Sequence, residues 1–139
     1  MMHWARARQA PFTPQGIAKS GAQGTSSGSW TKVTGWLAHS TYPATVVTSD
    51  GITVPAGPAC TITGQVTWGG SASGNQCRIL VDGVVVASSA TGAQVVQATY
   101  ALPASGAARL ITMEAVSNGL TGTRSIQPGD ANTYITATA

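Results

Sequence analysis

Few residues of this chain have the types and spacing that catalysis requires. A serine nucleophile needs a histidine base and an orienting acid, and the chain has two histidines, His3 and His39. Ser40 follows His39 directly, which is expected of a strand end more often than of a catalytic pair. Three of the four acids lie in glycine-containing turns, where aspartate is favoured for local hydrogen bonding: Asp50, Asp82 and Asp130. We therefore predict that the protein is not an enzyme.

Two residues are candidates for contacts between subunits. Glu114 is the only acid inside a predicted strand, and the alternation of that strand points it outward, as a surface charge or as the partner of a basic residue in another subunit. The closing strand, NTYITATA, turns Ile135, Ala137 and Ala139 inward and Tyr134 out of the opposite face. An outward tyrosine on a final strand needs a partner surface. We predict that Tyr134 and Glu114 lie in a trimer interface.

The chain lacks the pattern of a metal or cofactor site. Cys60 and Cys77 are too few for a four-ligand metal site or a disulfide framework. If their strands flank a single turn at GGSASGN, the two Cα atoms lie further apart than the roughly 7 Å limit for a disulfide. GGSASG is rich in glycine, but no helix or lysine follows it to complete a phosphate loop. We expect two buried, reduced thiols, no metal and no cofactor.

Three tryptophans occupy predicted strands: Trp30, Trp36 and Trp68. They either pack in the core or act as platforms on which sugars stack. Core packing is the preferred interpretation, because the predicted sandwich has few other large side chains.

The first twenty-nine residues, Met1–Ser29, form a predicted basic arm. They contain three bases and no acid, whereas four bases balance four acids from Trp30 to Ala139, so the net charge of +3 lies on the arm. The arm has no alternating apolar strand, so its apolar side chains either bind another protein or are incidental to a solvated tail. We predict that six residues anchor the arm: Trp4, Arg6, Arg8, Phe12, Ile17 and Lys19.

The composition narrows the classes of partner. Charged residues make up 8% of the chain, against roughly 25% in ordinary soluble domains, and such a surface favours neighbouring subunits. The balanced charge after Trp30, without a basic stripe interleaved with aromatics, predicts no binding of nucleic acid by the β domain. No apolar run approaches the roughly 18 residues of a membrane span or forms an export signal. We expect no membrane partner and synthesis in a cytoplasm.

From Trp30 onward, turn signals arrive at the spacing of an all-β sandwich. In CTITGQVTW, every second residue from Cys60 to Trp68 shares one face, which predicts a half-buried strand. Asp82-Gly83, between CRILV and VVVAS, predicts a tight hairpin. The predicted fold is all-β: residues 30–139 form an antiparallel β-sandwich, and residues 1–29 precede it as an extended arm.

The order of these elements resembles the jelly roll shared by tumour necrosis factor and the complement globular head. The resemblance rests on GITVPAGPACTITGQVTW, where a short strand leads through proline and glycine into a long strand, and on the paired strands of CRILVDGVVVAS. Phrases such as ITGQVTWGG, RILVDGVVVA and GDANTYITATA are also similar to jelly-roll domains of bacteriophage virion proteins. That resemblance implies a homotrimer that decorates capsids, forms head fibres or ends tail components.

Two functions follow from this resemblance. The first is a structural virion protein of a bacteriophage: a trimeric capsid decoration protein, of the cement or head-fibre kind, held on the capsid exterior by arms that bind the major capsid protein. The second is an adhesin, attached to a tail or head protein, whose jelly-roll loops bind a host cell-surface glycan. A receptor-binding tip is normally presented by a fibrous stalk, and neither heptads nor triple-helix repeats precede the domain. We therefore favour decoration.

Overall fold

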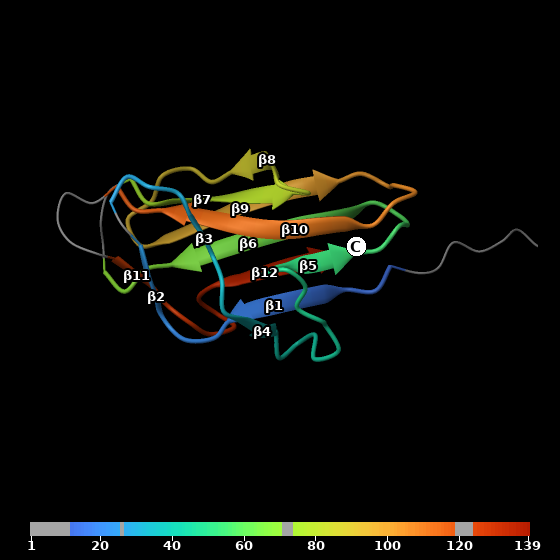
Figure 1. The fold of residues 1–139 in the computed structure, drawn as a ribbon, viewed down its shortest axis with the longest axis horizontal. Coiled ribbons are helices and arrows are strands. Elements are labelled where there is room, and N and C mark those ends of the chain that lie inside the picture. Colours follow the sequence, from blue (N-terminus) through green and yellow to red (C-terminus); the bar gives the residue numbers. More distant parts are fainter. Residues whose placement is uncertain (1–11, 26, 71–73, 119–123) are drawn as a thin grey trace, which may run out of the picture.

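The computed structural model describes residues 12–25, 27–70, 74–118 and 124–139, which form an antiparallel β-sandwich (Figure 1). One layer is a five-stranded sheet in the order β4-β1-β12-β6-β9, which we call the β12 sheet. Its strands have the following bounds: β4 (Trp36–Ala38), β1 (Gln15–Lys19), β12 (Tyr134–Thr138), β6 (Cys60–Thr67) and β9 (Val95–Leu102).

The other layer, which we call the β10 sheet, has the order β3-β10-β7-β8, and β5 also pairs with β10. Its strands have the following bounds: β3 (Thr31–Lys32), β10 (Arg109–Val116), β7 (Gln76–Val81), β8 (Val84–Ser88) and β5 (Ile52–Val54). A separate two-stranded ladder joins β2 (Gln23–Thr25) to β11 (Arg124–Ile126). The chain crosses repeatedly between the two layers, as a jelly roll does. The predicted antiparallel jelly-roll sandwich is confirmed.

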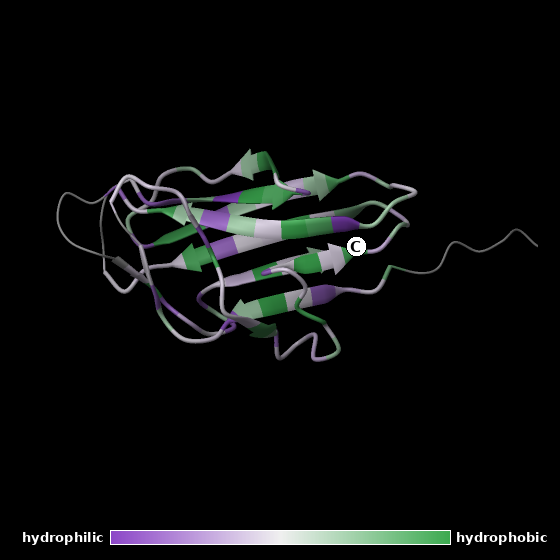
Figure 2. Ribbon diagram, in the orientation of Figure 1, coloured by the Kyte–Doolittle hydropathy of each residue, from purple (hydrophilic) through white to green (hydrophobic). Residues whose placement is uncertain are grey.

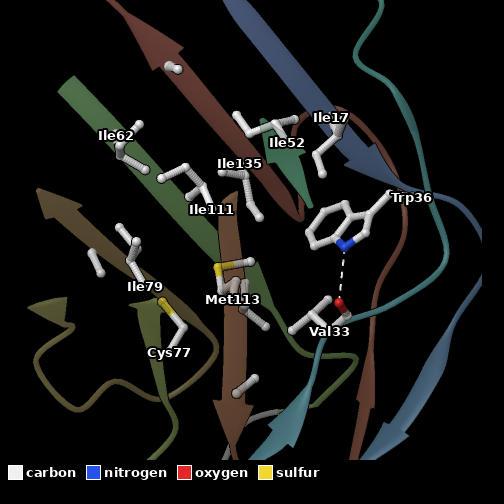
Figure 3. Packing of buried hydrophobic residues seen from close by; sticks show 14 of the residues in the cluster. Ile17, Val33, Trp36, Ile52, Ile62, Cys77, Ile79, Ile111, Met113 and Ile135 are labelled. Carbon is white, nitrogen blue, oxygen red and sulfur yellow. Dashed lines mark hydrogen bonds between the residues drawn. The ribbon is translucent and has the colours of Figure 1, made fainter. Parts of the chain in front are cut away.

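The core lies between the two sheets and is built by alternation along the strands. In β6, alternate residues from Cys60 to Val66 are buried, as predicted. Figure 2 shows the resulting mixture of apolar and polar positions along the strands of both sheets. In Figure 3, Ile17 and Ile135 of the β12 sheet lie near Ile111 and Met113 of the β10 sheet.

The end of β12 departs slightly from the prediction. Ile135 and Ala137 are fully buried and Tyr134 points the other way, as the alternation predicts. Ala139, however, is exposed, because it lies beyond the end of the strand at Thr138.

The tryptophans divide into two kinds. Trp36 and Trp68 are in the core, as predicted, and the Trp36 indole N–H donates a hydrogen bond to the Val33 carbonyl at 3.0 Å (Figure 3). The prediction is wrong for Trp30, which lies half-buried outside the core with the Arg78 guanidinium carbon 4.0 Å from its ring centre. Trp30 precedes β3 and so lacks the strand alternation that would turn it inward.

The Asp82-Gly83 hairpin is confirmed. Both residues have positive φ, 50° and 82°, as a two-residue turn matched to strand twist requires. The Asp82 carboxylate also accepts a hydrogen bond from the Leu110 backbone N–H at 2.8 Å, which ties the turn to β10.

The two cysteines are free and buried, but their strands are not neighbours in one hairpin. β6, with Cys60, pairs with β12 and β9, while β7, with Cys77, pairs with β10 and β8. The expected register across GGSASGN is therefore wrong, since the chain crosses there from one sheet to the other. Burial raises the pKa of the Cys77 thiol to about 11, so this thiol is protonated at neutral pH.

The predicted arm is too long. β1 lies between β12 and β4, and Ile17 is fully buried opposite Ile135. Residues 12–25 therefore belong to the sandwich, and the boundary at Ser29 is wrong. The sequence QGIAK does not show that it forms a strand of the sheet, because one of its two alternating faces carries only the small residues Gly16 and Ala18. A Cβ on Gly16 would lie 2.5 Å from the Tyr42 ring, so small residues are required there by a chain segment that is distant in sequence.

Candidate interaction surfaces

The outer face of the β12 sheet is built from strands that carry almost no charge. Among the residues of its five strands, the sole charged one is Lys19. Lys19 is 5% exposed, and its ammonium donates a hydrogen bond to the Thr34 carbonyl at 2.6 Å. Burial lowers the pKa of this lysine. The solvent-facing side of these strands therefore presents neutral side chains.

One row of cross-strand neighbours runs across this neutral face. Its members, which we call the Tyr134 row, are in register with one another: Leu37, Ala18, Tyr134, Gln65 and Gln97. Gln97 Nε2 donates a hydrogen bond to the Tyr134 hydroxyl at 3.0 Å, and this hydroxyl donates to Gln65 Oε1 at 3.2 Å. The row joins an aromatic ring, two amides and a leucine that is 62% exposed. This is a surface that a partner can cover without removing a charge from water.

His39 joins this row to a second tyrosine. The imidazole lies edge-on to the Tyr134 ring with 6.1 Å between centroids, and 5.7 Å from the centroid of Tyr42. The sequence predicted that Tyr134 faces outward, and the structure confirms this. It did not predict His39 and Tyr42 as neighbours, because they reach the face through a loop whose path is set by tertiary packing.

The His39, Ser40 and Asp130 side chains come together but do not form a catalytic triad. The Ser40 hydroxyl donates to the Asp130 carboxylate, and the Ser40 backbone N–H also donates to it at 3.3 Å. His39 Nδ1 accepts from the Thr41 N–H at 3.1 Å and lies 3.9 Å from Asp130. The serine thus faces the acid and not a histidine base. The hydrogen bonds from the Ser40 hydroxyl and backbone N–H hold the pKa of Asp130 below its ordinary value.

The outer face of the β10 sheet is charged instead. A cross-strand row there, which we call the Glu114 row, contains Lys32, Glu114, Arg78 and Ser88. Arg78 places both Nε and Nη2 2.7 Å from Glu114 Oε1, while Trp30 covers the guanidinium. Lys32 lies 3.9 Å from Asp50. The expected basic partner of Glu114 is therefore Arg78 of the same chain, and Glu114 and Tyr134 lie on opposite outer faces.

The six proposed anchoring residues are divided by the structure. Trp4, Arg6 and Arg8 lie outside the described residues. Phe12 packs against the core, and Ile17 and Lys19 are buried in β1. Ile17 and Lys19 are therefore not available to a partner, so their assignment as anchors is wrong, while Phe12 is partly buried against the core.

Exposed valines on two edge strands were missed by the sequence analysis. Val84 and Val85 of β8 are 64% and 42% exposed, and Val95 of β9 is 53% exposed. β8 and β9 are edge strands of the two sheets and contact each other (Figure 1). The available signal was VVVAS itself, because three consecutive valines in a strand cannot all face one core. Exposed, uncharged edges of this kind favour association.

A groove with a volume of about 420 Å³ lies beside the start of β1. It is lined by residues 13–15, by residues 41–46 with Thr48, and by Thr53 of β5. None of its lining residues is charged. Val46, on its wall, is 71% exposed.

The described residues show neither a metal-binding cluster nor a membrane-spanning helix. No group of three or more His, Cys, Asp or Glu side chains is placed there to hold a metal ion. Within that part of the chain, no helix is long and apolar enough to cross a bilayer.

Comparison with known proteins shows a similarity of fold and no similarity of sequence. No protein-family model matches the sequence, and no curated protein matches it. Among solved structures, the Eiger TNF from S. frugiperda is similar, with a TM-score of 0.65, 11% sequence identity and 92% of each chain covered. At this identity the likeness shows the fold alone. The chain therefore has a TNF-like jelly-roll fold.

Proposed function

We propose that this protein is a structural protein of a bacteriophage particle, a homotrimer that decorates the capsid exterior and is held to the major capsid protein by residues 1–11. The observation that carries the proposal is the neutral Tyr134 row on the β12 sheet. A face that can be covered without desolvating charge suits a permanent contact between copies. The TNF-like fold supports the same assembly, because trimers are usual for such jelly rolls.

The sequence before Phe12 supports the anchoring role. It contains Trp4, Arg6 and Arg8 and no acid, so it can combine apolar contact with charge pairing on an acidic capsid surface. Eleven residues span at most about 36 to 40 Å, enough to reach the adjoining surface of the shell. Three such arms on one trimer raise avidity by roughly two to four orders of magnitude where the lattice spacing suits them.

Two measurements test the proposal. Light scattering of the isolated protein is expected to give three times the 14.0 kDa of one chain, and a monomeric mass at micromolar concentration contradicts the trimer. Immunogold electron microscopy of purified virions is expected to label the capsid exterior. Labelling confined to tails, or absent from particles, contradicts capsid decoration.

A deletion then tests the anchor. Removing residues 1–11 leaves every described strand intact and is expected to abolish attachment to particles while the trimer persists. Charge reversal at Arg6 and Arg8 is expected to weaken attachment in a salt-sensitive way, because exposed charge pairs are screened over roughly 8 to 10 Å.

The adhesin alternative has one observation in its favour. Trp30 lies outside the core, where an aromatic ring is available for sugar stacking. Screening the protein against a glycan array, with Trp30→Ala as the control variant, tests this function. Binding that is lost in the variant favours the adhesin, and the absence of any binding leaves decoration as the better function.

A further inference from the structure

The groove beside β1 is an apolar surface that the described residues leave uncovered. Tyr42, Pro43 and Pro14 are among its lining residues, five threonines also line it, and no charged residue is present. Val46 is the most exposed of the large hydrophobic residues of the described chain, at 71%. Aromatic and proline-lined grooves without charge suit an extended segment that carries an apolar anchor.

The chain itself delivers such a segment to this place. Thr13 and Pro14 form part of the groove, so the segment before Phe12 is joined to the sandwich beside it. Trp4 is nine residues before Thr13, a separation that spans at most roughly 30 Å and allows the segment to turn back. A short tether also holds the segment at an effective concentration in the millimolar range, which favours its own groove over an untethered ligand.

The chemistry of the segment matches the groove. Trp4 supplies a large planar apolar group of the kind that packs against tyrosine and proline rings. Arg6 and Arg8 find no charge in the groove itself, but Asp50 lies in the turn next to the groove residue Thr48, where Gly51 and Thr48 exchange two backbone hydrogen bonds. Asp50 is half-exposed and holds its present partner, Lys32, at 3.9 Å. It is therefore open to a second cation.

We propose that residues 1–11 bind this groove of their own chain, with the Trp4 indole against Tyr42 and Pro43. We call this intramolecular contact the latch, because it would hold the segment against its own domain. The proposal does not depend on whether the protein belongs to a virion. A consequence is that any partner of the segment must compete with the groove, which lowers its apparent affinity by the fraction of segments that are free.

Paired cysteines in the full-length protein test the latch. The variant Ala5→Cys with Val46→Cys, which keeps Trp4, is treated with a short bismaleimide at low protein concentration, and Ala5→Cys with Val84→Cys is the matched control. Val46 and Val84 are 71% and 64% exposed, so neither substitution disturbs the core, and the native thiols are buried. We expect crosslinking at position 46 at least tenfold faster than at position 84, with the mass of one chain.

The outcomes are distinct. Equal rates at the two positions overturn the latch. A fast crosslink with the mass of two chains also overturns it and assigns the groove to the segment of a second copy. Hydrogen exchange gives a readout without cysteines: residues 41–48 are expected to exchange faster in Trp4→Ser than in the unmodified protein, and unchanged exchange counts against the proposal.

Discussion

The two outer faces of the sandwich each carry a row of cross-strand neighbours, and the rows differ in charge. The Tyr134 row places two amides and a phenol side by side, while the Glu114 row alternates base, acid and base. Both rows contain polar groups that pair within the chain. They differ in what covering them costs, because removing an ion pair from water costs more free energy than removing neutral amides and a phenol. The β12 sheet is therefore the better candidate for the proposed contact between copies, and the β10 sheet the better candidate for a face toward solvent.

The largest expected effect is a loss of stability, and it tests whether β1 is a strand of the β12 sheet. Ile17→Ala is expected to lower the free energy of unfolding by about 2 to 5 kcal/mol, because it opens a cavity under a central strand. Leu37→Ala in neighbouring β4 is the control, since Leu37 is 62% exposed and its loss is expected to change stability by at most about 0.5 kcal/mol. Urea unfolding measures both. Equal losses contradict the placement of β1.

The contrast between the faces is tested by adding an acid to each. Tyr134→Asp is expected to weaken trimer association by about 100-fold or more, because a charge is brought into a neutral contact. Trp30→Asp makes the same change from aromatic to acid on the β10 sheet and is expected to leave the trimer intact. Sedimentation equilibrium measures both variants. If only the Trp30 variant dissociates, the contact between copies lies on the outer face of the β10 sheet.

The single charge in the strands of the β12 sheet offers a third test. Replacement of a buried ion by an apolar residue of similar size is often stabilising, so Lys19→Met is expected to raise stability by about 1 kcal/mol at neutral pH. Burial lowers the folded pKa below the ordinary 10.5, so the folded protein binds this proton more weakly than the unfolded chain does. The difference between variant and wild type should therefore shrink as pH rises toward 10.5. Urea unfolding across this range measures it, and a constant difference contradicts the explanation.

The charged face is expected to contribute less. Glu114→Gln removes the acid from the Glu114 row and is expected to lower stability by at most about 1 kcal/mol, since both side chains of its pair with Arg78 are partly exposed. The loss should shrink in 1 M salt, where screening acts over about 3 Å. Thermal unfolding at two salt concentrations measures this. A change in oligomeric state would place Glu114 in the trimer contact after all.

The smallest effect lies at the margin of the neutral face. Ser40→Ala removes the hydroxyl that donates to Asp130 and is expected to raise the pKa of Asp130 toward its ordinary 3.8. Since the folded pKa lies below that value, the carboxylate stabilises the fold above pH 3.8, and this contribution is lost as pH falls through the folded pKa. NMR titration of the carboxyl group measures the shift. An unchanged pKa contradicts the role of Ser40.

The candidate surfaces were predictable where one strand alone determines orientation. Tyr134 follows from the alternation of a single strand, and its outward position is confirmed. The neighbours of Tyr134 and the partner of Glu114 come from other strands, so their identity depends on register and sheet order. β1 escaped prediction for the same reason, since three of its five residues are glycine, alanine or glutamine and only its neighbours make it a central strand.

Local sequence by itself determined the all-β class, the inward faces of β6 and β12 and the Asp82-Gly83 turn, because period-two alternation and positive φ are properties of adjacent residues. The tertiary structure alone decided which strands share a sheet, where β1 lies, and that the Glu114 row and the Tyr134 row lie on opposite outer faces. These features arise from pairing between residues far apart in the chain, where burial of a small or polar residue depends on the neighbour that covers it. Lys19 shows the difference: its sequence context indicated a basic arm, and its burial beneath the Thr34 carbonyl was set by the fold.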